Sequence, residues 1–183
     1  MSEFATHLDR IKDMSDDDKG EIINDIVHSA ESAGYTIADI DKARPWGGFV
    51  RFDYKDGDRF VEEFFPGLNP ADARLGNPEA ELSPKILYVS PEQRLSWQVH
   101  SRRAERWVFL SEGGYYKSRD ADNPGDLISA CAGDEVQFEA GECHRLVGAH
   151  DSFTLVAEIW QHTDPNQPSD EDDIVRLQDD YKR

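Results

Sequence analysis

Four polar side chains are spaced so that they could bind one divalent metal ion. Gln98 and His100 lie two residues apart in a segment whose pattern predicts a strand, so their side chains leave the same face of the sheet. Glu105 opens the next predicted strand after a turn, and His144 stands near a strand end just after Gly141. An amide oxygen, two imidazoles and a carboxylate form a competent ligand set that leaves room for water or substrate. The alternative is that the four side chains lie scattered on solvated strands.

Two carboxylates in apolar surroundings support a functional interpretation. Burying Glu105 without a partner would cost several kcal/mol, so a metal ion or a close cation is the natural compensation. Glu158 is flanked by Ala157 and Ile159 in an apolar predicted strand. It is either a general base or an inward carboxylate paired with an arginine, and the sequence leaves both open.

Other reactive side chains have no partner at a spacing that would bind a metal. His7, His28, His150 and His162 are predicted to lie at the surface. Cys143 adjoins His144, but its side chain should leave the opposite face of a strand, so it is predicted to pack in the interior.

The candidate ligands fall in a stretch that reads as many short strands. From residue 44 onward, runs rich in aromatic and β-branched residues alternate with Gly, Pro, Asp and Asn. Short strands without intervening helices predict a mainly β sandwich, jelly roll or barrel rather than a parallel α/β sheet. Residues 66–84 are predicted to form a surface loop, and residues 169–183 a short helix or a packed tail. The predicted strands are 46–54, 59–65, 85–89, 95–100, 105–111, 114–119, 135–138, 145–147 and 152–161.

The chain divides into a helical extension, residues 1–43, and a β domain, residues 44–183. Ser15 and the three aspartates after it are good N-cap and first-turn residues. Apolar residues then recur on one helical face before Gly34, a residue that commonly ends helices. This extension is predicted to pack over the main domain or a second subunit.

Composition excludes several classes of protein. The 183 residues suffice for one domain and an extension. A formal charge of −18, from 38 acidic and 20 basic residues, argues against nucleic-acid binding. The longest apolar runs are four residues, against the roughly 20 that span a bilayer. With no apolar signal segment near its start, the protein is expected to be cytoplasmic.

Two further compositional features bear on chemistry and habitat. Two cysteines exclude a disulfide framework or a four-cysteine zinc cluster within the chain. The acidity fits either a strongly solvated surface, which we favour, or adaptation to high salt.

Segments around the candidate ligands resemble the two motifs of the cupin superfamily. Residues 92–113 are similar to the first motif, a metal-binding segment in which Gln98 stands where the family has histidine. Residues 133–144 are similar to the second motif, which runs from a Gly-Asp turn to a histidine, with Glu139 in place of the usual proline. The resemblance implies a double-stranded β-helix barrel, a jelly-roll barrel, with the metal inside.

Within cupins, the chain resembles the type II phosphomannose isomerases, which also carry glutamine at the first ligand position. Four segments carry this resemblance in order along the chain: 44–47, 95–107, 143–146 and 171–176. The chain departs from that family at Ser101 and Arg102, where the family has further histidines. Lys85 and Arg145 match a family lysine and arginine, which implies that both line the cavity mouth and meet a phosphate. A surface role for the pair is the alternative.

The resemblance implies a metal-dependent aldose–ketose isomerase that interconverts mannose 6-phosphate and fructose 6-phosphate. The metal would be a Lewis acid, with zinc expected and iron, manganese, cobalt or nickel also compatible with the donors. Glu158 is one candidate base among several. The alternatives are an isomerase of an unphosphorylated sugar such as lyxose, and a cupin that binds a sugar without turnover. The resemblance also implies a homodimer. The net charge and the short apolar runs predict that it binds neither nucleic acid nor membrane.

Overall fold

A computed structural model of the chain describes residues 3–12, 14 and 18–182. Its helices are α1 (Glu3–Ile11), α2 (Lys19–Ser32), η1 (Tyr54–Asp56, a 3-10 helix), α3 (Gly57–Phe64) and α4 (Pro70–Ala73). Its strands are β1 (Ile37–Asp41), β2 (Gly47–Phe52), β3 (Lys85–Val89), β4 (Trp97–Val99), β5 (Arg103–Phe109), β6 (Gly113–Ser118), β7 (Ile128–Ala130), β8 (Glu135–Phe138), β9 (Cys143–Gly148), β10 (Thr154–His162) and β11 (Val175–Gln178).

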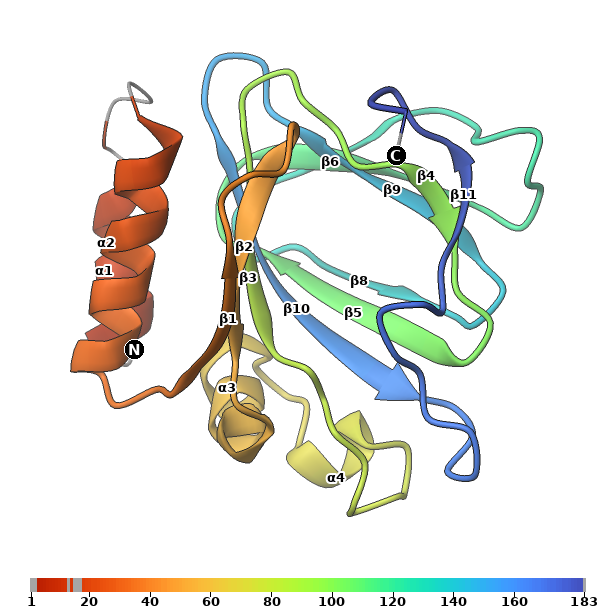
Figure 1. Cartoon of the computed structure of the whole chain (residues 1–183), viewed down its shortest axis with the longest axis horizontal. Coiled ribbons are helices and arrows are strands. Elements are labelled where there is room, and N and C mark those ends of the chain that lie inside the picture. The colour runs from red at the N-terminus through yellow and green to blue at the C-terminus, as the bar shows by residue number, and fades with distance from the viewer. Residues whose placement is uncertain (1–2, 13, 15–17, 183) are drawn as a thin grey trace.

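The strands form two antiparallel sheets that face each other (Figure 1). One sheet has the order β1-β2-β3-β10-β5-β8, and the other has the order β11-β4-β9-β6-β7. Apart from β1-β2-β3 and β6-β7, neighbours in each sheet are not consecutive in the chain, as in a jelly roll, where strands cross repeatedly between sheets. The prediction of a mainly β barrel with an N-terminal helical segment is therefore confirmed.

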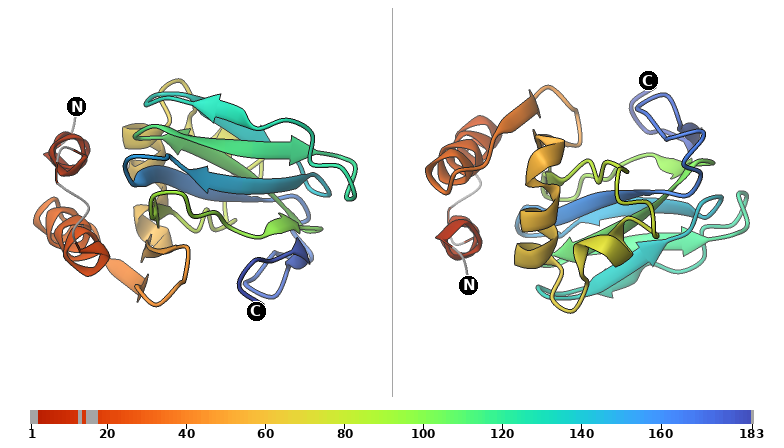
Figure 2. Two further views of the ribbon diagram at one scale, coloured as in Figure 1. Left: turned by 90° about the horizontal axis from the view of Figure 1, so that it is seen from above. Right: turned by 90° about the horizontal axis from the view of Figure 1, so that it is seen from below.

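Helices cover the outer face of the six-stranded sheet. Both views in Figure 2 place α1 and α2 together on one side of the barrel. Apolar residues of α1, α2 and α3 share one buried cluster with outward-facing residues of β2, β3, β5 and β10, which removes this apolar surface from water. The predicted cap of the second helix is present at Asp18, whose carboxylate accepts hydrogen bonds from the amides of Gly20 and Glu21. Ser15, Asp16 and Asp17 lie outside the described residues.

The prediction of a strand over residues 59–65 is wrong, because this segment belongs to helix α3. Its aromatic content suggested a strand, but its apolar residues do not alternate. Phe60, Val61 and Phe64 follow the i, i+1, i+4 spacing of a helical face, and all three are buried. The periodicity of burial therefore decides the structure here, and not the intrinsic preference for strands.

Strands β1 and β11 are two further corrections at the ends of the fold. The helical prediction for residues 1–43 holds only as far as Ser32, since Ile37–Asp41 pair with β2 as strand β1. The C-terminal segment contains strand β11, which pairs with β4, and not the short helix that its sequence allowed. Both strands are largely exposed, so neither carries the burial pattern that identifies a strand in sequence. No helix among the described residues is long and apolar enough to cross a membrane.

A second buried cluster fills the space between the two sheets. It contains inward-facing residues of β3, β5, β8, β9 and β10. Trp107, Phe138 and Leu146 are each fully buried there. This cluster occupies part of the interior, and the candidate ligands lie beside it. The ring centroid of His144 is 5.5 Å from that of Trp107 and 4.5 Å from that of Phe138.

Candidate metal centre

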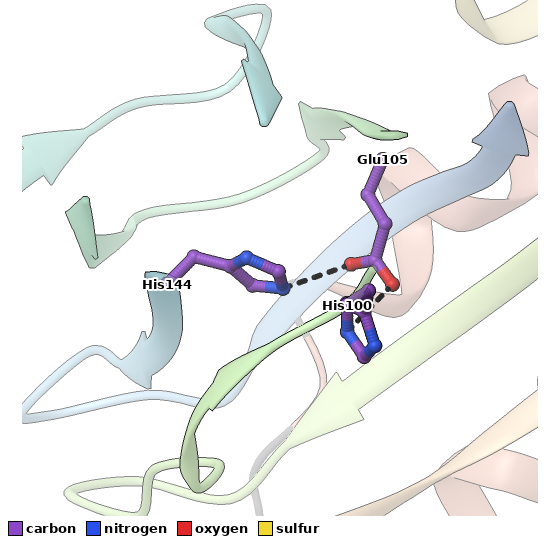
Figure 3. A group of neighbouring side chains, drawn as sticks. All are labelled: His100, Glu105 and His144. Atoms are coloured by element: carbon purple, nitrogen blue, oxygen red, sulfur yellow. Dashed lines mark ion pairs between the residues drawn. The ribbon is translucent and has the colours of Figure 1, made fainter. Parts of the chain in front are cut away.

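Strands from both sheets bring the predicted ligands together. Gln98 on β4 lies directly opposite His144 on β9, so both side chains leave the same face of the smaller sheet. His100 follows in the turn after β4, and Glu105 reaches toward them from β5 in the larger sheet. Figure 3 shows His100, Glu105 and His144 pointing toward one another.

Glu105 bridges the two imidazoles. Its Oε1 lies 3.1 Å from His100 Nε2, and its Oε2 lies 3.1 Å from His144 Nε2. All three donor atoms lie within 4.8 Å of one another, and none of the three residues is more than 2 % exposed. These distances suit a group of ligands that surround a single small cation.

Backbone carbonyl groups fix which imidazole nitrogen carries the proton. His144 Nδ1 donates to the carbonyl oxygen of Glu142 at 3.1 Å, and His100 Nδ1 donates to the carbonyl oxygen of Asp173 at 2.5 Å. A carbonyl oxygen only accepts, so in each neutral imidazole the lone pair is on Nε2, which faces Glu105. This is the outer-shell arrangement that orients histidine ligands in metal sites.

Two buried acceptor atoms of the cluster face each other. Among the described residues, His144 Nε2 and Glu105 Oε2 lack a hydrogen-bond partner, although they are 3.1 Å apart. A neutral imidazole and a carboxylate turn two lone pairs toward each other at this point, which is unfavourable without a positive charge between them. A proton on His144 would relieve this one contact, whereas a divalent cation would satisfy all three residues. The donors therefore fit a metal such as zinc.

The electrostatic environment keeps the cluster in its metal-binding protonation states. Burial lowers the pKa of His100 and the negative charge of Glu105 raises it, but burial together with the charge of Arg103 prevails and leaves the pKa at about 4, so the imidazole is neutral at pH 7. Burial opposes ionisation of Glu105, but its interactions with His100, Arg103 and His144 outweigh burial and hold the pKa of that carboxyl well below its ordinary range. At pH 7, where His100 is neutral, Arg103 supplies the permanent positive charge beside it. A carboxylate with a neutral imidazole is ready to bind a metal without first releasing protons.

Gln98 lies beside the cluster but turns its nitrogen toward it. Its Nε2 is 3.3 Å from His100 Nε2, and its Oε1 accepts a hydrogen bond from Ser96 Oγ at 2.8 Å. Binding of a metal requires the amide oxygen, so the side-chain amide would have to rotate by half a turn. The role of Gln98 as the fourth ligand stays a prediction.

A cavity of about 100 Å³ opens between the sheets next to the ligands. Gln98 lines it from the smaller sheet, and Lys85, Glu105 and Glu158 line it from neighbouring strands of the larger sheet. Its remaining lining residues are Arg44, Trp46, Phe49, Leu87, Leu95, Ser96, Arg103, Trp160, Glu171, Ile174 and Arg176.

Strand register places Glu158 between Lys85 and Trp107. Glu158 on β10 pairs with Lys85 on β3 and with Trp107 on β5. Trp107 Nε1 donates to Glu158 Oε1 at 3.0 Å, and Lys85 Nζ lies 3.9 Å from Oε2. The partners of this inward carboxylate are thus a lysine and an indole, not the arginine that the sequence had suggested as an alternative.

Burial makes Glu158 a group that can exchange protons near neutral pH. Burial raises its pKa to about 7, and the negative charge of Glu105 raises it too, whereas Lys85, Arg103 and the Trp107 hydrogen bond act in the opposite direction. A carboxyl group that titrates near 7 inside a cavity is a candidate general base.

This pKa predicts a measurable effect of pH on stability. Between about pH 4.5 and 7, Glu158 binds a proton in the folded protein but is ionised in the unfolded chain, so its contribution to stability falls as pH rises. His100 acts oppositely between about 4 and 6.5, because its pKa is lowered in the fold. Glu158→Gln removes only the first effect. The quantity to compare is the free energy of unfolding of the metal-free wild type minus that of the metal-free variant. We expect this difference to fall by about 2–3 kcal/mol between pH 4.5 and 7. Urea unfolding at both pH values tests this, and an unchanged difference would contradict it.

Arg145 does not lie where the sequence placed it, at the mouth of the cavity. It follows His144 directly on β9, and successive side chains of a strand point to opposite faces. Arg145 Nη2 instead donates to the carbonyl oxygen of Gln178 at 3.1 Å, and the residue does not line the cavity. Burial and the nearby charge of Arg94 lower its pKa. A role for Arg145 in binding substrate is therefore not proposed further.

Residues that sequence reasoning did not single out complete the surroundings of the site. Arg103 lies two residues before Glu105 on the same strand, so alternation alone could have placed it on the inward face. Trp160 pairs with Glu105 across β10 and β5. His162, which was predicted to lie at the surface, is buried, and its Nδ1 accepts a hydrogen bond from the amide of Ser169 at 2.9 Å.

Asp173 fastens the C-terminal segment to the turn that carries His100. Its carboxylate accepts hydrogen bonds from the amides of Ser101 and Arg102, both 3.0 Å, and from the hydroxyl groups of Ser101 and Ser169, both 2.8 Å. Burial opposes ionisation, but these hydrogen bonds together lower the pKa of the carboxyl far below its usual value. The segment thereby holds the Asp173 carbonyl group against His100.

The two facing antiparallel sheets, with histidines and a glutamate turned into the space between them, define a cupin-type barrel with a candidate metal centre. No protein-family model matches the sequence, and no curated protein matches it either. Solved structures do resemble the fold.

Two crystal structures of the capsular polysaccharide assembling protein CapF from Staphylococcus aureus are similar to this chain. One has a TM-score of 0.51 at 14 % identity, over 96 % of this chain and 45 % of that chain. The other has a TM-score of 0.50 at 15 % identity, over 85 % and 37 %. A cupin 2 conserved barrel domain protein from Salinispora arenicola gives a TM-score of 0.45 at 15 % identity, over 69 % and 83 %. The chain thus spans less than half of the CapF chains, and at this identity the likeness shows the fold alone.

Proposed function

We propose that the protein is a metal-dependent aldose–ketose isomerase that acts on a sugar phosphate, with mannose 6-phosphate and fructose 6-phosphate as its substrate pair. The observation that carries the proposal is one cavity with two kinds of group on its walls. Glu105 of the ligand cluster and Glu158, with a pKa of about 7, both line it from the neighbouring strands β5 and β10. Interconversion of an aldose and a ketose requires both, since a proton moves between adjacent carbons while negative charge develops on oxygen.

The residues have distinct tasks in this reaction. A bound divalent metal supplies Lewis-acid polarisation of the sugar oxygens. His100, Glu105 and His144 would hold it. Glu158 Oε1 is fixed by the indole of Trp107, which leaves Oε2 to take the proton from one carbon and return it to the next.

Lys85 tunes and orients this base. Its ammonium group lies 3.9 Å from Glu158 Oε2, 3.3 Å from Glu171 Oε1 and 3.8 Å from the ring centroid of Trp160. The positive charge favours the ionised carboxylate, which is the form that accepts a proton. Burial, with only 5 % of Lys85 exposed, limits its motion.

The charge of the cavity lining supports a phosphorylated substrate. Four basic residues, Arg44, Lys85, Arg103 and Arg176, line the cavity against three acidic ones, Glu105, Glu158 and Glu171, although the chain carries a formal charge of −18. An anionic substrate approaching so acidic a protein needs a local positive field, and arginine and lysine supply the usual contacts to phosphate. This lining favours a sugar phosphate over a neutral sugar.

A coupled assay tests the proposal. The protein, loaded with zinc or manganese, is expected to convert mannose 6-phosphate to fructose 6-phosphate, and inorganic phosphate is expected to inhibit competitively because it occupies the same cationic lining. If the protein instead converts lyxose and phosphate does not inhibit it, the substrate is an unphosphorylated sugar and not mannose 6-phosphate. Binding of metal without turnover of any aldose would contradict the isomerase proposal.

A further inference from the structure

One arginine reaches into the ligand cluster from the same strand as Glu105. Arg103 Nε lies 2.8 Å from Glu105 Oε1, and its Nη2 lies 3.2 Å from His100 Nε2. The residue is only 5 % exposed. Its guanidinium group therefore contacts two of the atoms that would bind the metal.

Residues outside the ligand cluster also contact the guanidinium group. Arg103 Nη1 donates to Ser169 Oγ and to the carbonyl oxygen of Asp170, both at 3.0 Å. The ring of Trp160 packs against it, with its centroid 3.7 Å from the guanidinium carbon. Because these contacts come from two elements outside the ligand cluster, the charge is fixed next to the ligands rather than free to leave for solvent.

Arg103 and a metal ion compete for the same lone pair. His100 Nδ1 donates to the carbonyl oxygen of Asp173, so Nε2 has the single lone pair of the neutral ring. That lone pair can accept a hydrogen bond, from Arg103 Nη2 at 3.2 Å or from Gln98 Nε2 at 3.3 Å, or it can bind a metal, but it cannot do both. The positive charge of Arg103 also repels a divalent cation bound a few ångströms away.

We propose that Arg103 is a positioning residue that stabilises the metal-free ligand cluster and thereby lowers the affinity of the site for metal. The proposal rests on the metal centre of the proposed function. It explains why two ligands have a cationic partner while His144 Nε2 and Glu105 Oε2 have none among the described residues. Arg103 shields half of the cluster and leaves the other half open to the incoming ion.

The test compares two neighbouring arginines. Arg103→Met keeps much of the side-chain length but removes the charge and the donors. Arg102→Met is the matched control, because the Arg102 side chain pairs with Asp170 at 2.8 Å and lies 3.8 Å from Asp173, and among the described residues it contacts none of the ligands. By isothermal titration calorimetry, we expect zinc to bind R103M about tenfold or more tightly than wild type, and R102M within about twofold of it. The melting temperature of the metal-free R103M protein is expected to fall, since Glu105 loses its buried partner.

A positioning role predicts that R103M binds zinc more tightly although it is less stable, whereas a merely structural role predicts a loss of stability without tighter binding. A destabilised R103M protein with equal or weaker zinc affinity would overturn the Arg103 proposal and leave the metal centre standing. Absence of zinc binding by the wild type and R103M alike would overturn both. Zinc binding by R103M alone would support the role of Arg103 and contradict a metal-dependent activity of the native chain.

Two further measurements cover the case in which R103M does not fold. Arg103→Lys keeps the charge but loses the planar fork, so its zinc affinity is expected to lie between those of wild type and R103M. In the wild-type protein, zinc should shift the Arg103 side-chain NH resonances in an NMR spectrum, because the Nη2 contact with His100 must break. Unchanged resonances at saturating zinc would contradict the competition.

Discussion

His144→Ala is expected to lower the affinity of the protein for zinc by about 1,000-fold and to abolish isomerase activity with it. His144 is 1 % exposed, and its Nε2 faces Glu105 without another hydrogen-bond partner among the described residues. Its removal takes away one of three converging donors and leaves a cavity that no neighbouring side chain can fill with a nitrogen ligand. Bound metal and turnover should therefore disappear together.

The measurement combines elemental analysis with the coupled mannose 6-phosphate assay. His28→Ala is the matched control, because His28 lies exposed on α2, which covers the outer face of the larger sheet. It should retain wild-type metal content and activity. Full turnover by a metal-free His144→Ala protein would disprove the metal-dependent mechanism.

The core of the candidate site could be predicted because it depends on local rules. The period of two in a strand predicts that the side chains of Gln98 and His100 lie on one face, and they are adjacent although His100 falls in the turn just after β4. The turns at Gly133 and Gly141 set the ends of β8 ahead of His144. Both glycines have positive φ, at +94° and +80°, a conformation that few other residues adopt. Spacing along the chain therefore identifies Gln98, His100 and His144 as candidate ligands without knowledge of tertiary contacts.

The alternation of side chains along a strand also determines the direction of Arg145. His144 and Arg145 are adjacent on β9, so they cannot both face the interior. Resemblance to a family placed Arg145 at the cavity mouth, but strand geometry directs it outward. Where a resemblance and the strand period disagree about a side chain, the period decides.

Residues that act through long-range contacts could not be predicted from spacing. Asp173 holds Ser101 across a separation of 72 residues, and although residues 171–176 resemble a family segment, no spacing in the chain predicts this contact. Arg103 differs, because its place on the inward face follows from Glu105, yet its bond to His100 depends on a turn whose shape the sequence does not specify. Helix α3 shows the converse, since its apolar residues follow the period of a helix although its composition is typical of strands.

Glu158→Gln is expected to lower kcat by about 100- to 10,000-fold, the range that a positioned general base contributes. Glutamine has nearly the same shape and can still accept the hydrogen bond that Trp107 Nε1 gives to Oε1, but it cannot take a proton from carbon. Because the ligand cluster is untouched, metal content should stay at the wild-type level, and KM should change much less than kcat.

A second carboxylate separates this catalytic effect from a general loss of charge. Glu135→Gln makes the same substitution on β8, where the carboxylate pairs with Arg106 and does not line the cavity. Its kcat should remain within about threefold of wild type, since surface ion pairs contribute little. If Glu158→Gln keeps more than about a tenth of the wild-type kcat, a different group moves the proton, because the loss would fall below what general base catalysis supplies. The buried carboxylate between Lys85 and Trp107 would then serve only to balance the lysine charge.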